Sequence, residues 1–121
     1  MTKIVINTQY GGFSLSDTAT ELYLNLRGLP WVKKTNLGRF MLRENYYTTS
    51  PGEEDQFFSC RDISRTDETL IEVIEQLGAE ANGRCASLKI IDLQPGTKYR
   101  IQEYDGDEWI ETEADIEWSI A

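Results

Sequence analysis

The sequence predicts an α+β fold in which two helices pack on a mostly antiparallel sheet of four to five strands, ending in a C-terminal β-meander. Three observations support this. A β-branched run opens the chain, two amphipathic helical patterns follow, and the last third holds short apolar runs separated by Pro-Gly and Asp-Gly turns. With 121 residues, 40% of them hydrophobic, the chain is expected to form a single domain over residues 1–121.

The first half is predicted to alternate strand, helix and strand. Residues 2–8 (TKIVINT) suit a strand, and Ser16 suits the N-cap of a helix that ends near Gly28. The core-facing stripe of this helix is expected to be Ala19, Leu22, Tyr23 and Leu26. A second strand is predicted over residues 38–45, followed by an exposed, mobile loop over residues 46–56.

The second half is predicted to hold the clearest helix and three strands. The helix lies within residues 64–83, is capped by Thr66 or Asp67, and buries Leu70, Ile71, Ile74 and Leu77. Strands follow at residues 86–93 and 98–104. The pair Asp105-Gly106 then predicts a tight hairpin turn before a last strand that runs to residue 120.

Charge and composition limit the kinds of partner and the location that are expected for this chain. The net charge is −9, distributed as +3 over residues 1–50, −6 over 51–97 and −6 over 98–121. Phosphates would be repelled over most of such a surface, so direct nucleic-acid binding is not expected and basic protein partners are favoured. No apolar run reaches the roughly 20 residues of a membrane span, and no signal peptide is apparent, so a cytoplasmic location is expected.

Catalytic and metal chemistry are not expected. The chain has no histidine, which removes the commonest general base, and its two cysteines, Cys60 and Cys85, do not form a metal-binding pair. Asp62 and Asp67 are a conceivable carboxylate pair, but nothing in the sequence orients them. We therefore expect a protein that is not an enzyme, with no cofactor and no metal.

The first candidate site is a glycine-rich loop between the first strand and the first helix. Adjacent glycines let an anion approach the backbone N–H groups of a helix start, and nearby serines and arginines add donors. The loop matches neither common nucleotide-binding glycine motif, so the alternative is a tight turn with a capping serine beside a local ion-pair cluster. The candidate anion-binding residues are Gly11, Gly12, Ser14, Ser16, Arg61 and Arg65.

The second candidate site is the acidic face of the last strand. Period-two alternation places apolar residues on one face and acids on the other, with successive acids about 6.6–6.8 Å apart. This spacing is similar to that of phosphates along a nucleic acid, so the face suits a cationic protein partner. Protection of an edge strand from aggregation is the alternative, and a calcium site lacks the full loop pattern. The acids are Glu111, Glu113, Asp115 and Glu117.

Paired aromatic residues flank the predicted loop. Tyr46-Tyr47 begin it and Phe57-Phe58 follow it, so they serve either as core residues or as exposed anchors of an interface. Tyr46 and Tyr47 therefore join the four acids as candidate partner-binding residues.

Three blocks resemble a known family. "KIVIN..YGGFSLS", "RDISRTDETLIEVIEQLGAEANGRCASLKI" and "Y.I.EYDG.EWI" are similar to small uncharacterised proteins of bacteriophages and prophages. Residues 28–56 lie outside the resemblance. Relatives often have proline where this chain has Ser64 and a histidine near the glycine loop, so chemistry that needs that histidine is not expected here. The resemblance implies a phage accessory protein that acts in a bacterial cytoplasm.

These observations favour a non-catalytic protein that binds a protein of the bacterial host. The most specific version of this prediction is that it inhibits an anti-phage defence. A binder of an anionic, nucleotide-like small molecule at the glycine loop is the first alternative. A virion or assembly component is the second. The sequence leaves the oligomeric state and the strand order open.

Overall fold

The computed structural model describes residues 2–37 and 42–112. Two α-helices and seven strands confirm the α+β class. The elements are β1 (Thr2–Asn7), α1 (Asp17–Leu26), β2 (Trp31–Leu37), β3 (Leu42–Thr48), β4 (Gln56–Phe58), the 3₁₀ turn η1 (Cys60–Asp62), α2 (Glu68–Leu77), the 3₁₀ turn η2 (Gly78–Ala81), β5 (Leu88–Leu93), β6 (Tyr99–Tyr104) and β7 (Asp107–Thr112).

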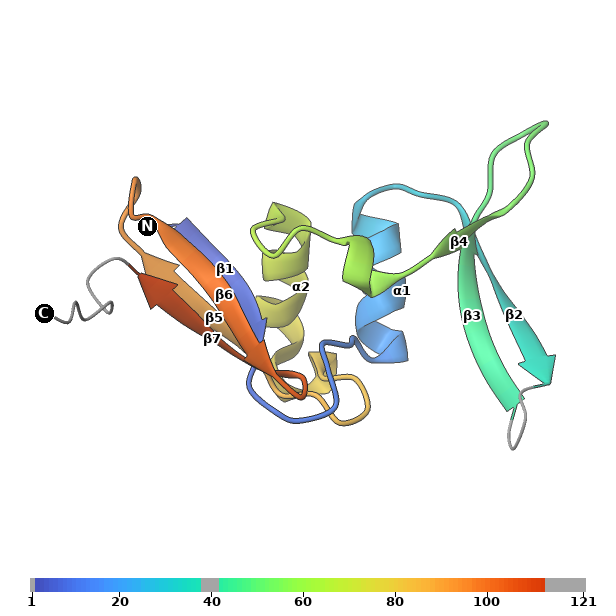
Figure 1. Ribbon diagram of the computed structural model, residues 1–121. Helices are drawn as coiled ribbons and strands as arrows, with labels where there is room; N and C mark the ends of the chain where they lie inside the picture. Colours follow the sequence, from blue (N-terminus) through green and yellow to red (C-terminus); the bar gives the residue numbers. More distant parts are fainter. Residues whose placement is uncertain (1, 38–41, 113–121) are drawn as a thin grey trace, which may run out of the picture.

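The helices occupy the middle of the molecule. In Figure 1, α1 and α2 lie between the β1–β5 pair on one side and the β2–β3–β4 sheet on the other. Both helices begin at the predicted kind of cap, since the side chains of Ser16 and Asp67 accept hydrogen bonds from the backbone of the first turn. The two helices can bury apolar residues towards both sides because each is covered by the other helix and by a sheet.

The strands form three antiparallel sheets within the described residues, instead of the one sheet of four to five strands that the sequence suggested. The sheet orders are β1–β5, β2–β3–β4 and β6–β7. The predicted C-terminal meander is therefore reduced to the β6–β7 hairpin, because β5 pairs with β1, where Ile4 lies opposite Ile91. Ile4 and Val5 of β1 are fully buried, so this strand belongs to the interior and not to an exposed edge.

Residues 31–58 differ most from the prediction. No strand is predicted at Trp31–Leu37, where the structure has β2. The predicted second strand is observed at Leu42–Thr48, with residues 38–41 outside the described part. Tyr46 and Tyr47 thus belong to a strand and not to a loop, and the segment between β3 and β4 is confined to residues 49–55. Pairing of Tyr47 with Phe57 across β3 and β4 explains the change, because cross-strand aromatic pairs stabilise a sheet.

The core joins the helices to both sheets. Val5, Leu24, Leu70 and Val73 are fully buried, and Tyr46 packs into the same cluster from β3. Ala19 and Tyr23 of the predicted α1 stripe are buried, but Leu26 is exposed and Leu24 takes its place. No helix of the described residues is long and apolar enough to cross a membrane.

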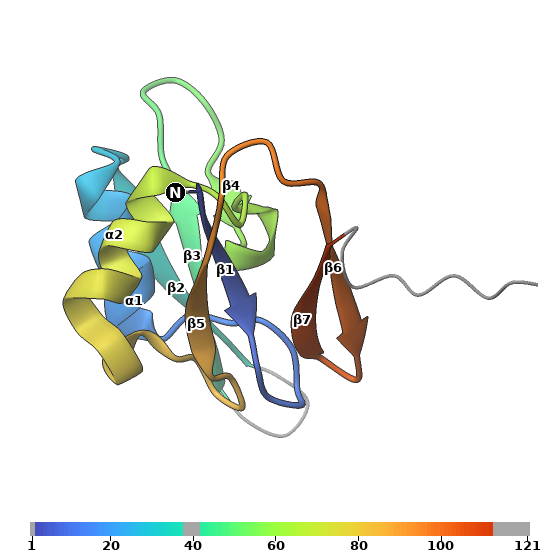
Figure 2. The same cartoon turned by 90° about the vertical axis from the view of Figure 1, so that its left-hand side faces the viewer.

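The β6–β7 hairpin lies at the edge of the β1–β5 pair. Figure 2 shows β7 beside β1, with β6 outermost and the C-terminal end of β1 close to the hairpin turn. This places the glycine loop that follows β1 next to the turn at Asp105-Gly106. The candidate site forms at that junction.

Candidate functional site

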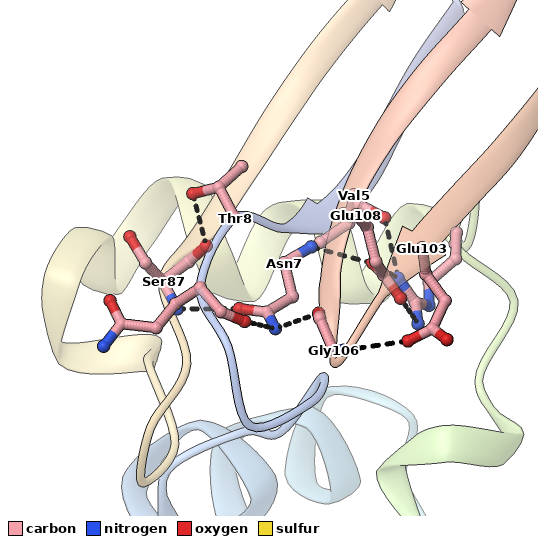
Figure 3. Close-up of polar contacts among 9 residues, drawn as sticks. Val5, Asn7, Thr8, Ser87, Glu103, Gly106 and Glu108 are labelled. Carbon is pink, nitrogen blue, oxygen red and sulfur yellow. Dashed lines mark hydrogen bonds and ion pairs between the residues drawn. The ribbon is translucent and has the colours of Figure 1, made fainter.

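Asn7 joins three segments at the end of β1 and is fully buried. Its Nδ2 donates to the carbonyl oxygens of Gln9 and Gly106, both at 2.7 Å, and its Oδ1 accepts from the Ser87 N–H at 2.9 Å. Its own N–H donates to Glu108 Oε1 at 2.8 Å (Figure 3). Buried polar groups are stable when they are hydrogen-bonded, so this one side chain specifies how the hairpin turn meets β1.

An ion pair between the partly buried Arg65 and the buried Glu108 connects the segment before α2 to the hairpin. The guanidinium of Arg65 donates to both carboxylate oxygens of Glu108, with Nη2 to Oε2 at 2.8 Å. Arg65 also completes the free edge of β1, because its carbonyl accepts from Val5 N–H at 2.8 Å and its Nη1 donates to Val5 O at 3.3 Å. Its guanidinium carbon lies 3.9 Å from the ring centre of Phe13. Such two-pronged pairing fixes orientation as well as distance.

The glycine loop is in direct backbone contact with the hairpin turn. The Gly11 N–H donates to the Asp105 carbonyl at 3.0 Å. Gly106 has a φ of +93°, and a Cβ placed on it would lie 2.2 Å from the nitrogen of Gly12. Only glycine fits at position 106, both because of its left-handed backbone and because the two backbones touch. Gly106 thus has a structural role, which is to let the hairpin turn pack against the glycine loop.

A cleft of about 520 Å³ opens beside this contact. Four of the six residues predicted to bind an anion come together here, since the glycine loop and both arginines contribute to the walls. The lining residues are Gly11, Gly12, Phe13, Arg61, Arg65, Glu103, Asp105, Gly106 and Glu108.

The charge of the cleft does not suit a polyanion. Its lining carries two arginines and three acids, a net charge of −1. The charge of Arg65 is already matched by Glu108. The other charged residues of the lining are Arg61, Glu103 and Asp105. A nucleotide phosphate would therefore meet one available cation and two anions in the same small space.

The two predicted serines do not line the cleft. Ser14 Oγ donates to the carbonyl of Arg84 at 3.2 Å. Ser16 Oγ donates to the carbonyl of Glu80 at 2.6 Å and accepts from the Ala19 N–H at 3.1 Å. Both hydroxyls tie the start of α1 to the segment after α2, so they hold the loop in place and offer no donor to a ligand.

The β6–β7 hairpin has an inner and an outer face. Glu108 points inward and is buried, whereas its neighbour Trp109 points outward and is 45% exposed. Trp109 lies opposite Gln102 on β6, and Tyr104 on the same face is 70% exposed. The alternation of side chains along a strand thus presents two large aromatic residues to solvent.

One of the four predicted acids can be placed. Glu111 lies on the outer face of β7 and forms an ion pair with Arg100, directly opposite it on β6. The other three acids, and the expected continuation of the strand to residue 120, lie outside the described residues; these acids are Glu113, Asp115 and Glu117.

The two predicted tyrosines point to opposite sides of the β2–β3–β4 sheet. Tyr46 is buried against α1, which makes it a core residue and not an exposed anchor, and its Oη donates to Glu21 Oε2 at 2.9 Å. Burial, reinforced by this bond to a carboxylate, raises the pKa of Tyr46 to about 12. Tyr47 faces outward and packs edge-on against Phe57, with ring centres 5.8 Å apart.

The central residues of the junction were not singled out from the sequence. Asn7 follows a β-branched run and Glu108 is one acid among many, so neither has a pattern of its own. The only usable signal is the Asp105-Gly106 turn, which fixes the pairing of Glu103 with Glu108. It does not reveal that Glu108 is buried, because that depends on Arg65 from another element.

Within residues 2–37 and 42–112, no three histidine, cysteine or acidic residues are grouped so that they could hold a metal ion. Cys60 and Cys85 are both free thiols. Comparison with known proteins gives no family model, no curated protein and no solved structure that matches this chain. The function has to be judged from the geometry of the cleft and the hairpin.

Proposed function

We propose that this chain is a non-catalytic binding protein that docks on a basic surface of another protein through the outer face of the β6–β7 hairpin. The observation that carries the proposal is the exposure of Trp109 and Tyr104 on one face of a strand pair whose other face is anchored by the buried Glu108. Tryptophan and tyrosine are the residues that most often dominate binding energy at protein interfaces.

The charge of the hairpin supports a cationic partner. Residues 99–112 contain one arginine and five acidic residues, a net charge of −4. A local field of this sign attracts a basic surface during diffusion and repels acidic competitors, so it acts mainly on the rate and selectivity of association. The aromatic side chains then supply the apolar contact.

The way in which the hairpin is attached to the rest of the fold also supports a binding role. Asn7, Arg65 and Glu108 fix the hairpin at several points before any partner arrives. A surface that is already ordered loses less conformational entropy on binding, and so retains more of its contact energy as affinity.

One of the two acids considered for catalysis, Asp67, has a structural role. Asp67 caps α2 by accepting from the Leu70 N–H at 2.9 Å, and it also accepts from Tyr23 Oη and Arg27 Nη1, both at 3.2 Å. Its carboxylate is occupied on both oxygens, so it is poorly placed to act with Asp62 as an acid–base pair.

The partner that we propose is a protein of the bacterial cytoplasm, as the resemblance to phage proteins implies. In its most specific form, the proposal is that this partner belongs to a host defence and that binding inhibits it. A photo-crosslinking amino acid at position 109 tests this in host lysate. We expect one crosslinked partner. The crosslinking yield should fall at high salt, and crosslinking should be lost when the substitution Tyr104→Ala is also made. The same crosslinker at Phe57, which is 60% exposed at the other end of the molecule, is the control.

Two results would contradict this function. One is the absence of any crosslinked protein at position 109 under conditions where the folded chain is intact. The other is a partner captured equally well at positions 109 and 57, because a specific hairpin surface would not produce it. Capture of a virion protein at position 109 would favour an assembly role over an inhibitory one.

A further inference from the structure

The cleft behind the hairpin contains one cation that the fold does not use. The guanidinium of Arg61 makes no ion pair or hydrogen bond with any described residue, unlike that of Arg65. Arg61 lies over the glycine loop, since a Cβ placed on Gly12 would be 3.7 Å from Arg61 Nη2. Within the described part of the chain the Gly12 N–H also has no hydrogen-bond acceptor. Arg61 and the Gly12 backbone therefore lie close together in the lining of the cleft.

The lining of the cleft also carries negative charge that is available. The Asp105 carbonyl is used by Gly11, but its carboxylate accepts no hydrogen bond from the described residues. Glu103 accepts from the Gly106 N–H at 2.9 Å through one oxygen, which leaves the second oxygen available. Both acids line the same cleft as Arg61.

We infer that the cleft binds a small zwitterion of the amino-acid class, with its carboxylate on Arg61 and the Gly12 N–H and its cationic group on Asp105 and Glu103. An arginine fork suits a carboxylate, and two carboxylates suit an ammonium or guanidinium group. The Arg65–Glu108 pair also lines the cleft and contributes no net charge. A volume of about 520 Å³ lies within the range of small-molecule sites.

This site is separate from the proposed protein-binding surface. The cleft lies at the inner side of the hairpin with Glu108, whereas Trp109 and Tyr104 point outward. A ligand in the cleft would touch both the turn and the glycine loop, so it would also strengthen the attachment of the hairpin.

Isothermal titration of the full chain tests the inference with three probes. L-arginine has both charged ends, agmatine lacks the carboxylate, and valerate lacks the cation. We expect L-arginine to bind at least about tenfold more tightly than either of the others, which is the loss expected from one charged hydrogen-bond contact. Equal affinity for L-arginine and agmatine, or no binding of any probe, would overturn the inference.

Substitutions test which residue binds each end of the ligand. Arg61→Gln is expected to reduce the affinity for L-arginine to that for agmatine, and Asp105→Asn to reduce it to that for valerate. Asparagine tolerates the positive φ of 51° at position 105, so the turn is kept. Arg84→Gln removes an exposed arginine that does not line the cleft and should leave the affinity unchanged.

Two further outcomes separate this inference from its alternatives. Tighter binding of a nucleoside phosphate than of L-arginine would overturn it in favour of an anion site. Crosslinking from position 109 should be the same in the wild type and in Arg61→Gln, so failure of the cleft and failure of the protein-binding surface are seen in different experiments.

Discussion

The β2–β3–β4 sheet and the β6–β7 hairpin are attached to the same helical centre by opposite means. The sheet is held by aromatic packing, as Phe58 stacks on Tyr23 of α1 with ring centres 5.8 Å apart and Tyr46 enters the core. The hairpin is held by a polar network around Asn7 and Glu108 and by backbone contact between two turns. Figure 1 shows the two regions on opposite sides of the helices.

This difference bears on what each region can do. Apolar packing is nearly non-directional and tolerates small shifts, whereas a buried network of charged and amide groups is stable only in one geometry. The hairpin is thus presented at a fixed angle with its aromatic side outward. Because the attachment depends on a few polar contacts, single substitutions at the junction should detach the hairpin from β1.

Loss of Glu108 should give the largest effect. Glu108→Ala leaves the guanidinium of Arg65 partly buried without its carboxylate and the Asn7 N–H without an acceptor. We expect a loss of about 3 kcal/mol in the free energy of unfolding, measured by urea denaturation. Hydrogen exchange should accelerate over residues 99–112 and remain unchanged over residues 42–48.

The matched control for this prediction is Glu111→Ala on the same strand. Its partner Arg100 is 63% exposed, so the pair is well solvated and should contribute less than about 1 kcal/mol. Equal effects of the two substitutions would show that the hairpin is not held by the buried pair.

Substitution of the turn glycine should be the next largest effect. Gly106→Ala combines a left-handed backbone with a Cβ 2.2 Å from the nitrogen of Gly12, and we expect a loss of about 2 kcal/mol in the free energy of unfolding. Gly96→Ala has a similar φ of +86° but no atom within 4 Å of the added Cβ. It should lose only about 1 kcal/mol. If the two alanine variants unfold at the same urea concentration, the close contact contributes nothing.

The α+β class and both helices could be predicted because local signals decide them. Caps and helical spacing act within one turn, and Ser16 and Asp67 do cap α1 and α2. The pairing of β5 with β1 could not be predicted, since it joins residues more than 80 positions apart and depends on which apolar strands reach α2. The strand at Trp31–Leu37 lacks regular alternation and is identified by its pairing with β3.

The site was predictable to the extent that it rests on turns. The glycine loop and the two arginines do meet, but no sequence pattern indicates that the carboxylate of Glu108 pairs with Arg65. Which of many acids is buried depends on tertiary contacts between distant elements. Adjacent aromatic residues show the same limit, because strand alternation sends Tyr46 inward and Tyr47 outward, and the face buried is set by α1.

Substitution of Tyr46 should give the smallest effect at neutral pH, and this effect should depend on pH in the alkaline range. Tyr46→Phe removes the bond to Glu21, so we expect a loss of about 1 kcal/mol at pH 7. The folded-state pKa is raised from 10.0 to about 12, so this stability is complete below pH 10 and is lost as the pH rises towards 12. Urea midpoints of wild type and Tyr46→Phe should therefore converge above pH 10. A constant difference across that range would mean that Tyr46 ionises as freely as an exposed tyrosine and that the sheet is not packed on α1.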